Sequence, residues 1–288
     1  MQRRKPDPIP AIHPLPEYLA TGPVRDSYED TKAVLGVPWM GVVTMAFAHY
    51  PAFWDVLWSG LRPLCASEEF GAARQRLRER SEAHVTILST PPLTAELQAR
   101  GYAPREIESI AAAQEIFAEG NMAYLLIATL ARLLLEGESL SETSEVNCIT
   151  PRGRPSPAPL VLMEPHHAEP ETRALYTDMQ TVLGLPFVNT DYRALARWPT
   201  YLHVAWAGLR PRIADASYAT VTQAIHDEAV ALARALPNPA GLTPEMLREA
   251  AERDAAPGEV ARVVQLFQWL LPGLVANIAV FQAQLARG

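Results

Sequence analysis

The chain repeats one sequence pattern at a constant spacing of 148 positions. Six identical matched pairs define the repeat: Tyr28 and Tyr176, Gly36 and Gly184, Pro38 and Pro186, Pro51 and Pro199, Trp58 and Trp206, and Arg62 and Arg210. No gap is needed across some 35 residues. An internal repeat of this kind predicts two copies of one structural unit within the 288 residues.

The sharpest difference between the two copies is a carboxylate. Val43 in the first copy is matched by Asp191 in the second, within the sequence Asn189-Thr190-Asp191. One explanation is a helix N-cap, because Asn, Thr and Asp side chains accept hydrogen bonds from the free N–H groups of a first turn. The matched segment that begins at Met40 has no such residues, so capping is not a requirement of this fold. Asp191 is therefore the first candidate for catalysis.

Helical signals dominate the chain, and strand signals are scarce. Stretches rich in Ala, Leu, Glu and Arg have high helix propensity: 68–83, 106–119, 218–236 and 259–271. Thr94 and Thr243 mark two further helix starts, and Pro244 stands where a helix tolerates it. We therefore predict an all-α fold of two tandem helical repeats, packed as a pseudo-dimer with the active site in the crevice between them.

Composition divides the chain into four segments. Residues 1–24 form an N-terminal arm, 25–136 the first helical repeat, 137–171 a Pro-rich linker, and 172–288 the second repeat, which carries Asp191. The Pro, Gly and Ser residues of the linker cannot continue a helix. The linker either tethers the two repeats or covers the crevice between them.

Charge and cysteine content argue against several classes of protein. With 25 Lys and Arg against 32 Asp and Glu, the net charge of −7 argues against nucleic-acid binding. No uninterrupted apolar run is long enough to predict a membrane span, and the basic start lacks the apolar segment of a secretory signal. Cys65 and Cys148 stand alone, which is typical of a reducing compartment. We expect a soluble cytoplasmic protein that binds neither nucleic acid nor membrane.

Other candidates for chemistry are few. Asn121 precedes the apolar sequence that ends at Leu135, either as the cap of a helix starting there or as an amide that orients water or substrate. The adjacent pair His166 and His167 has no further ligand at metal-site spacing. A G-x-S-x-G nucleophile motif and a glycine-rich phosphate loop are both missing from the sequence. We expect neither a metal nor an organic cofactor.

These motifs resemble those of the group I 2-haloacid dehalogenases, the family of D- and DL-2-haloacid dehalogenases. Four motifs carry the resemblance: Tyr28-Glu29-Asp30, Val37-Pro38-Trp39, Gly120-Asn121-x-x-Tyr124-Leu125-Leu126, and Thr190-Asp191-Tyr192-x-Ala194-Leu195-Ala196-x-Trp198-Pro199. The resemblance implies the same duplicated all-α layout. It also implies a hydrolase that replaces the halogen at C2 of a short 2-haloalkanoate with a hydroxyl group, with inversion. The expected partners are a small halogenated carboxylate as substrate and a second copy of the chain in a homodimer.

The resemblance also assigns roles at the centre of a site. It implies that Asp191 activates a water that attacks C2 directly, and that Asn121 helps to hold this water. Thr190 stands where related enzymes carry Ser, and it would help to position the substrate carboxylate. The residues themselves leave a second route open, because a carboxylate can also attack carbon and form an ester. Only the resemblance favours activation of water.

Further residues are assigned to the pocket walls. Trp39 and Tyr124 match pocket residues of the family, and Phe187 is the counterpart of Trp39 in the second copy. Val42 stands where a related enzyme has a bulkier aromatic residue, which changes the expected size of the pocket. Asn189 matches the D-specific relatives, whereas a DL-acting relative has Ala there. We therefore expect specificity for the D isomer.

Two other functions fit parts of the pattern. A non-catalytic helical protein would bind a small carboxylate, or act as a scaffold, without releasing halide. Small helical repeats also resemble the alkyl hydroperoxidase D-like and carboxymuconolactone decarboxylase-like proteins. The peroxidase members need a C-x-x-C pair, which Cys65 and Cys148 cannot form.

Overall fold

The computed structural model describes residues 1–149 and 160–286, which form twelve α-helices, two short 3₁₀ helices and no β-strand. The α-helices are α1 (Gly22–Leu35), α2 (Val42–Ala48), α3 (Pro51–Cys65), α4 (Glu68–Val85), α5 (Thr94–Ala99), α6 (Pro104–Leu135), α7 (Pro170–Leu183), α8 (Thr190–Leu195), α9 (Pro199–Ile213), α10 (Ala216–Ala235), α11 (Pro244–Asp254) and α12 (Glu259–Leu285). The 3₁₀ helices are η1 (Glu17–Leu19) and η2 (Thr86–Leu88). The predicted all-α class is confirmed.

The repeat in the sequence recurs in the helix bounds. Helices α7, α8, α9 and α10 begin 148 positions after α1, α2, α3 and α4, respectively. One contact is also repeated: Trp58 Nε1 donates to Asp30 at 2.8 Å in the first copy, and Trp206 Nε1 donates to Asp178 at 2.8 Å in the second. Both tryptophans are buried, as expected. Matched residues therefore make matched local structure.

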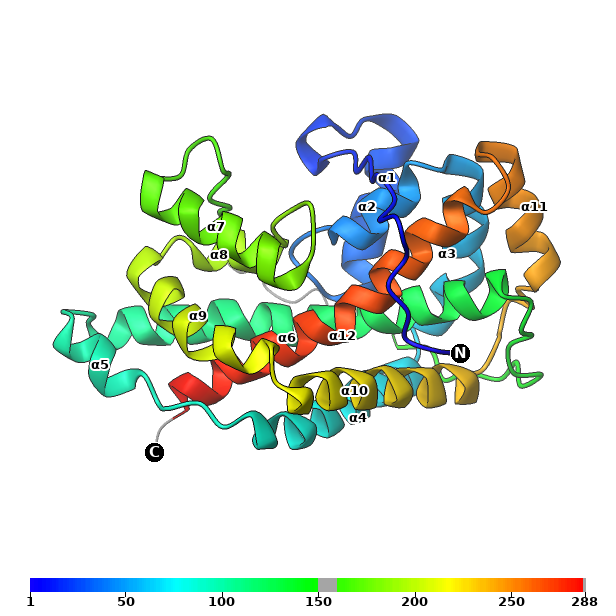
Figure 1. The fold of residues 1–288 in the computed structure, drawn as a ribbon. Helices are drawn as coiled ribbons and strands as arrows, with labels where there is room; N and C mark the ends of the chain where they lie inside the picture. Colours follow the sequence, from blue (N-terminus) through cyan, green and yellow to red (C-terminus); the bar gives the residue numbers. More distant parts are fainter. Residues whose placement is uncertain (150–159, 287–288) are drawn as a thin grey trace.

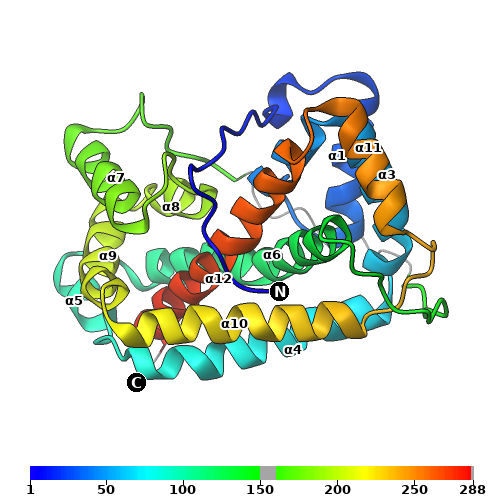
Figure 2. The same cartoon turned by 45° about the vertical axis from the view of Figure 1, so that its right-hand side comes forward.

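Helices α6 and α12 cross at the centre of the molecule, and the other helices surround them (Figure 1). Helices α4 and α10 run side by side along one edge, while α7–α9 and α1–α3 with α11 form two groups on the opposite side (Figures 1 and 2). Helices of the first copy pack on helices of the second: α3 on α11, α4 on α10, and α6 on α12. One hydrophobic core therefore contains residues of both copies. A two-fold relation between the copies stays a prediction.

Both central helices are long and apolar enough to cross a membrane by composition alone, which the sequence pattern did not predict. Within the fold, however, 89% of the apolar window of α6 and 83% of that of α12 is buried. A helix that is apolar on all sides is one that is enclosed on all sides. The mutual burial of α6 and α12 therefore accounts for their composition.

Local signals set several helix ends. Gly36 and Gly184 follow α1 and α7 with φ of 67° and 63°, a left-handed conformation that glycine adopts without strain. Thr243 caps α11 by accepting a hydrogen bond from Met246 N at 3.3 Å, as expected. The matched expectation for Thr94 is wrong, because Thr94 is the first residue of α5 and its side chain makes no capping bond.

The arm before α1 lies across α12. Arg262 donates to Pro8 O at 2.6 Å, and Gln265 donates to Arg4 O at 3.1 Å. The centre of the Pro-rich linker, 150–159, lies outside the described residues. The described end of the linker packs on α8, where Met163 N donates to Arg193 O at 2.9 Å.

Candidate active site

Asp191 and Asn121 form a buried pair that joins the two copies. Asp191 lies in the first turn of α8 and is only 3% exposed. Its Oδ1 accepts a hydrogen bond of 2.7 Å from Nδ2 of Asn121, which lies in the middle of α6. The alternative of Asn121 as the cap of a helix start is therefore wrong. The N-cap of α8 is Asn189, as the capping explanation places it, but its side chain makes no capping bond.

The surroundings of Asp191 make it a stronger base than an exposed aspartate. Burial raises the pKa of its carboxyl from 3.8 to about 7, because desolvation disfavours the charged form. The hydrogen bond from Asn121 and the positive charge of Arg193 act in the opposite direction and keep the anion accessible. A group with a pKa near neutrality is suited to accept a proton during a reaction.

All eight residues that the sequence assigned to a site lie around one small cavity of about 30 Å³. They are Trp39, Val42, Asn121, Tyr124, Phe187, Asn189, Thr190 and Asp191. The cavity lies between α2 of the first copy and α8 of the second. Val43 also lines it, so the carboxylate and its apolar counterpart in the repeat face the same space.

Two glycines allow the aromatic wall to approach the backbone. A Cβ atom on Gly120 would lie 2.3 Å from Cη2 of Trp39, and a Cβ on Gly41 would lie 2.6 Å from Cζ of Tyr124. Gly41 N donates to the Tyr124 hydroxyl at 2.9 Å, and this hydroxyl donates to Trp39 O at 2.9 Å. The wall is therefore held by sterics and by hydrogen bonds.

Two parts of the site were missing from the sequence-based prediction. The first is the face of α12 that closes the pocket, made by four apolar residues: Phe267, Leu270, Leu271 and Leu274. The second is Arg193, whose Nη2 donates to Thr190 Oγ1 at 3.2 Å and whose Nη1 pairs with Glu164 at 2.6 Å. A signal existed for Arg193, since it is the one cation in the segment 190–195 and follows Thr190 by three residues, the spacing that places two side chains on one face of a helix.

A wider hollow of about 540 Å³ adjoins the pocket. The two spaces share Val42 and Phe187, and the hollow is also lined by Arg173 and Arg193. The pocket itself has a free volume of about 30 Å³, which exceeds the roughly 10–15 Å³ that one water needs. The pocket and the hollow are therefore neighbours, with Val42 and Phe187 in the wall of each.

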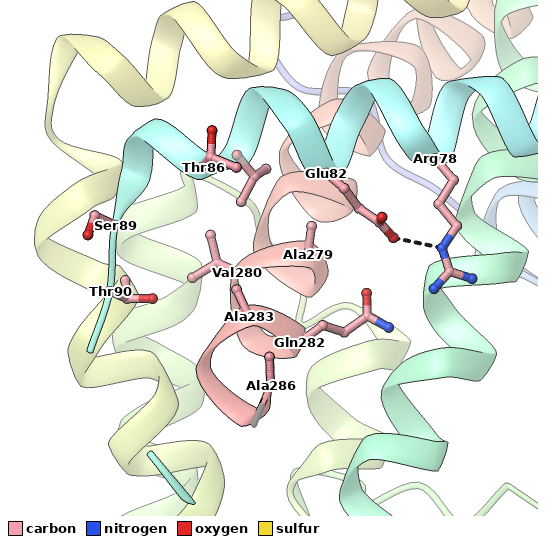
Figure 3. Close-up of a pocket in the computed structure, with 11 residues that line it drawn as sticks. Arg78, Glu82, Thr86, Ser89, Thr90, Ala279, Val280, Gln282, Ala283 and Ala286 are labelled. Atoms are coloured by element: carbon pink, nitrogen blue, oxygen red, sulfur yellow. Dashed lines mark hydrogen bonds and ion pairs between the residues drawn. The ribbon is translucent and has the colours of Figure 1, made fainter. Parts of the chain in front are cut away.

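A groove of about 400 Å³ lies between the end of α4 and α12 (Figure 3). None of the predicted site residues lines it, and its Arg78 is paired with Glu82 at 2.8 Å. A void of about 10 Å³ shares Arg78 and Gln282 with this groove and Asn121 with the pocket. This void is close to the smallest space that holds a water. A water-sized space therefore separates the groove from the amide beside Asp191.

Comparison with known proteins identifies the family. Residues 38–183 match a family model described as Halocarboxylic acid dehydrogenase DehI. Over 248 residues the chain is 45% identical to the (R)-2-haloacid dehalogenase of Rhizobium sp. (strain NHG3), an alignment that covers 86% of this chain and 96% of that protein. The chain belongs to the 2-haloacid dehalogenase family.

Other members of the 2-haloacid dehalogenase family agree in sequence and in fold. The chain is 36% identical to the (R)-2-haloacid dehalogenase of Pseudomonas putida over 279 residues, which is 95% of this chain and 92% of that protein. A solved structure described as the complex structure of D-2-haloacid dehalogenase with L-LA superposes with a TM-score of 0.90 at 33% identity, covering 99% of this chain and 100% of that one. The resemblance found in the motifs is therefore confirmed.

The two cysteines bear on the peroxidase alternative. Both cysteines are free; Cys65 is buried and Cys148 is exposed. Burial raises the pKa of the Cys65 thiol to about 12, so this side chain stays protonated near neutral pH. Membership in the 2-haloacid dehalogenase family and the missing C-x-x-C pair both argue against a peroxidase.

Proposed function

We propose that the chain is a D-2-haloacid dehalogenase, which converts a short D-2-haloalkanoate and water into the L-2-hydroxyalkanoate, halide and a proton. The observation that carries the proposal is the buried Asp191–Asn121 pair in a small, mainly apolar pocket. Similarity to two (R)-2-haloacid dehalogenases supports this substrate class and isomer.

In the proposed reaction, Asp191 acts as the general base. Its carboxylate takes a proton from a water while the water oxygen attacks C2 from the side opposite to the halogen. The C–halogen bond breaks as the C–O bond forms, and the halide leaves with the bonding electron pair. The Asn121 amide donates to Asp191 Oδ1, and this bond holds the carboxylate in one orientation toward the water. Attack opposite to the leaving group inverts C2.

The substrate carboxylate needs donors, because it enters a pocket that already holds a carboxylate. Thr190 supplies a hydroxyl, and Asn189 supplies an amide that makes no hydrogen bond to any described side chain or backbone group. Arg193 lies behind Thr190 and adds a fixed positive charge. Asn189 is 8% exposed and fits a role in selecting between the D and L isomers.

Attack by the carboxylate itself would give an ester, and one turnover in ¹⁸O-labelled water distinguishes the two routes. With enzyme in excess over D-2-chloropropionate, activation of water places the label in the lactate of the first turnover. Ester formation would instead place an unlabelled oxygen of Asp191 in that lactate. Unlabelled product would remove the general-base mechanism and keep the dehalogenase.

Chloride release from D- and L-2-chloropropionate, measured separately, tests the function itself. We expect release from the D isomer, with L-lactate as the product, and none from the L isomer. Asp191→Asn should abolish release with an unchanged far-UV circular dichroism spectrum. Asp178→Asn is the matched control, because Asp178 belongs to the same repeat as Asp191 but contacts Trp206 and Arg210 and does not line the pocket. Binding of the substrate without any halide release would favour the carboxylate-binding protein.

A further inference from the structure

A second cavity of about 210 Å³ lies beside the active-site pocket, beneath the N-terminal arm. Its walls come from the arm, α7, α8, α10 and α12. The two spaces share three wall residues, Asn189, Leu270 and Leu274. Of the residues that line this cavity, the proposed reaction uses only Asn189.

The arm places a cation in the cavity wall. Arg3 Nε donates to Trp269 O at 3.1 Å, and its guanidinium lies 5.5 Å from the centre of the Trp269 ring. Among the described residues no carboxylate pairs with Arg3, and none lines the cavity. Burial lowers the pKa of the Arg3 guanidinium, because desolvation disfavours its charge. A half-buried cation without a counter-ion is costly, and an anion would offset that cost.

The opposite wall offers neutral donors. Tyr218 donates its hydroxyl to Asn277 Oδ1 at 2.8 Å, and Asn277 Nδ2 donates to the Tyr192 hydroxyl at 2.8 Å. Tyr192 is only 1% exposed, and its own hydroxyl proton has no acceptor among the described residues. The cavity is therefore lined by free donors and by no acid.

We propose that this cavity binds a small monovalent anion, and that this anion is the halide released in the active-site pocket. The guanidinium of Arg3 and the hydroxyl of Tyr192 supply the donors, and the apolar remainder of the wall suits a weakly hydrated ion. Asn189, Leu270 and Leu274 line both spaces, so the second cavity adjoins the pocket in which halide would be released. The identity of the anion rests on the proposed function, whereas the anion site rests on the cavity alone.

Chloride NMR tests the site without any turnover. Bound chloride in fast exchange broadens the bulk resonance, so we expect broadening that saturates with wild-type protein. Arg3→Met should weaken the chloride affinity by about tenfold or more, the loss expected when a charged hydrogen-bond donor is removed. Tyr192→Phe, which keeps the ring but removes both the free donor and the acceptor for Asn277 Nδ2, should weaken it less. Lys5→Met is the matched control, since Lys5 lies 5.2 Å from the same Trp269 ring but does not line the cavity.

Equal broadening by the wild type, Arg3→Met and Tyr192→Phe would overturn the proposal. L-lactate tests the other possible source of a small anion. If lactate binds with the same dependence on Arg3 and chloride does not, the halide assignment is wrong. Thermal unfolding of each variant shows whether a loss of chloride affinity comes from an unfolded protein. If the N-terminal arm detaches in Arg3→Met, Tyr192→Phe still tests the site, because that substitution leaves the arm unchanged. Because no substrate is used, failure here leaves the proposed dehalogenation standing, and an inactive enzyme leaves the anion site standing.

Discussion

The pKa of Asp191 predicts a pH profile that a single substitution should move. Burial raises this pKa from 3.8 to about 7, a change of roughly 4 kcal/mol at about 1.36 kcal/mol per pKa unit. The base must be ionised, so kcat/KM for D-2-chloropropionate should rise with pH up to about 7 and then level off. Replacing Asn121 with Ala removes a charge-assisted hydrogen bond worth about 1.5–3 kcal/mol. The rising part of the profile should then move up by roughly one to two pH units, to about 8 or 9.

The assay is chloride release at subsaturating substrate between pH 5 and pH 10, because kcat/KM reports the free enzyme. The substrate carboxyl is ionised throughout this range and adds no step of its own. Asn277→Ala is the matched control, since Asn277 is another buried mid-helix asparagine but bonds Tyr192 and Tyr218 rather than Asp191. A wild-type profile that is flat down to pH 5 would refute the raised pKa of Asp191. An Asn121→Ala profile with an unmoved midpoint would refute the role of the amide.

Three other outcomes follow from the site. The raised pKa of Asp191 makes the stability of the wild type fall as pH rises from about 4 to about 7. Asp191→Asn should therefore raise the unfolding temperature above that of the wild type by roughly 5–10 °C at pH 8 and by little at pH 4. Equal melting curves of the two proteins at both pH values would contradict this. Gly120→Ala should displace Trp39 and lower kcat/KM at least tenfold, while the helical control Gly71→Ala, whose Cβ meets no atom within 4 Å, should stabilise the protein by about 0.5–1 kcal/mol without changing activity. Asn189→Ala should allow chloride release from L-2-chloropropionate, and an unchanged D-to-L ratio of rates would remove Asn189 from isomer selection.

Much of the site was predictable because the repeat supplies its own reference. Comparing Val43 with Asp191 singled out a polar residue in a position that the fold allows to be apolar. Trp39 precedes Val43 by four positions and Phe187 precedes Asp191 by four, so each aromatic residue lies in the same short segment as one member of that pair. Each segment joins two helices and ends in the first turn of α2 or α8, so the packing of these helices brings both segments to one pocket.

The missing parts depend on contacts between distant segments. One of the two alternatives for Asn121 was a helix start, because apolar sequence begins after it, but the buried helix α6 starts at Pro104 and continues through it. The wall made by α12 could not be read from the sequence, because an apolar helix has no unique face to assign to a pocket. Arg3 lies 266 positions from its partner Trp269, and no local pattern predicts such a contact.

The crossing of α6 and α12 also has a consequence for biosynthesis. The end of α6 leaves the ribosome more than 120 residues before α12 begins, a delay of about 6 to 25 s at about 5–20 residues per second. During that interval the most apolar surface of the first repeat has no partner. The nascent chain is therefore exposed to aggregation until α12 arrives, and soluble yield should depend on chaperone supply far more than the stability of the finished protein suggests.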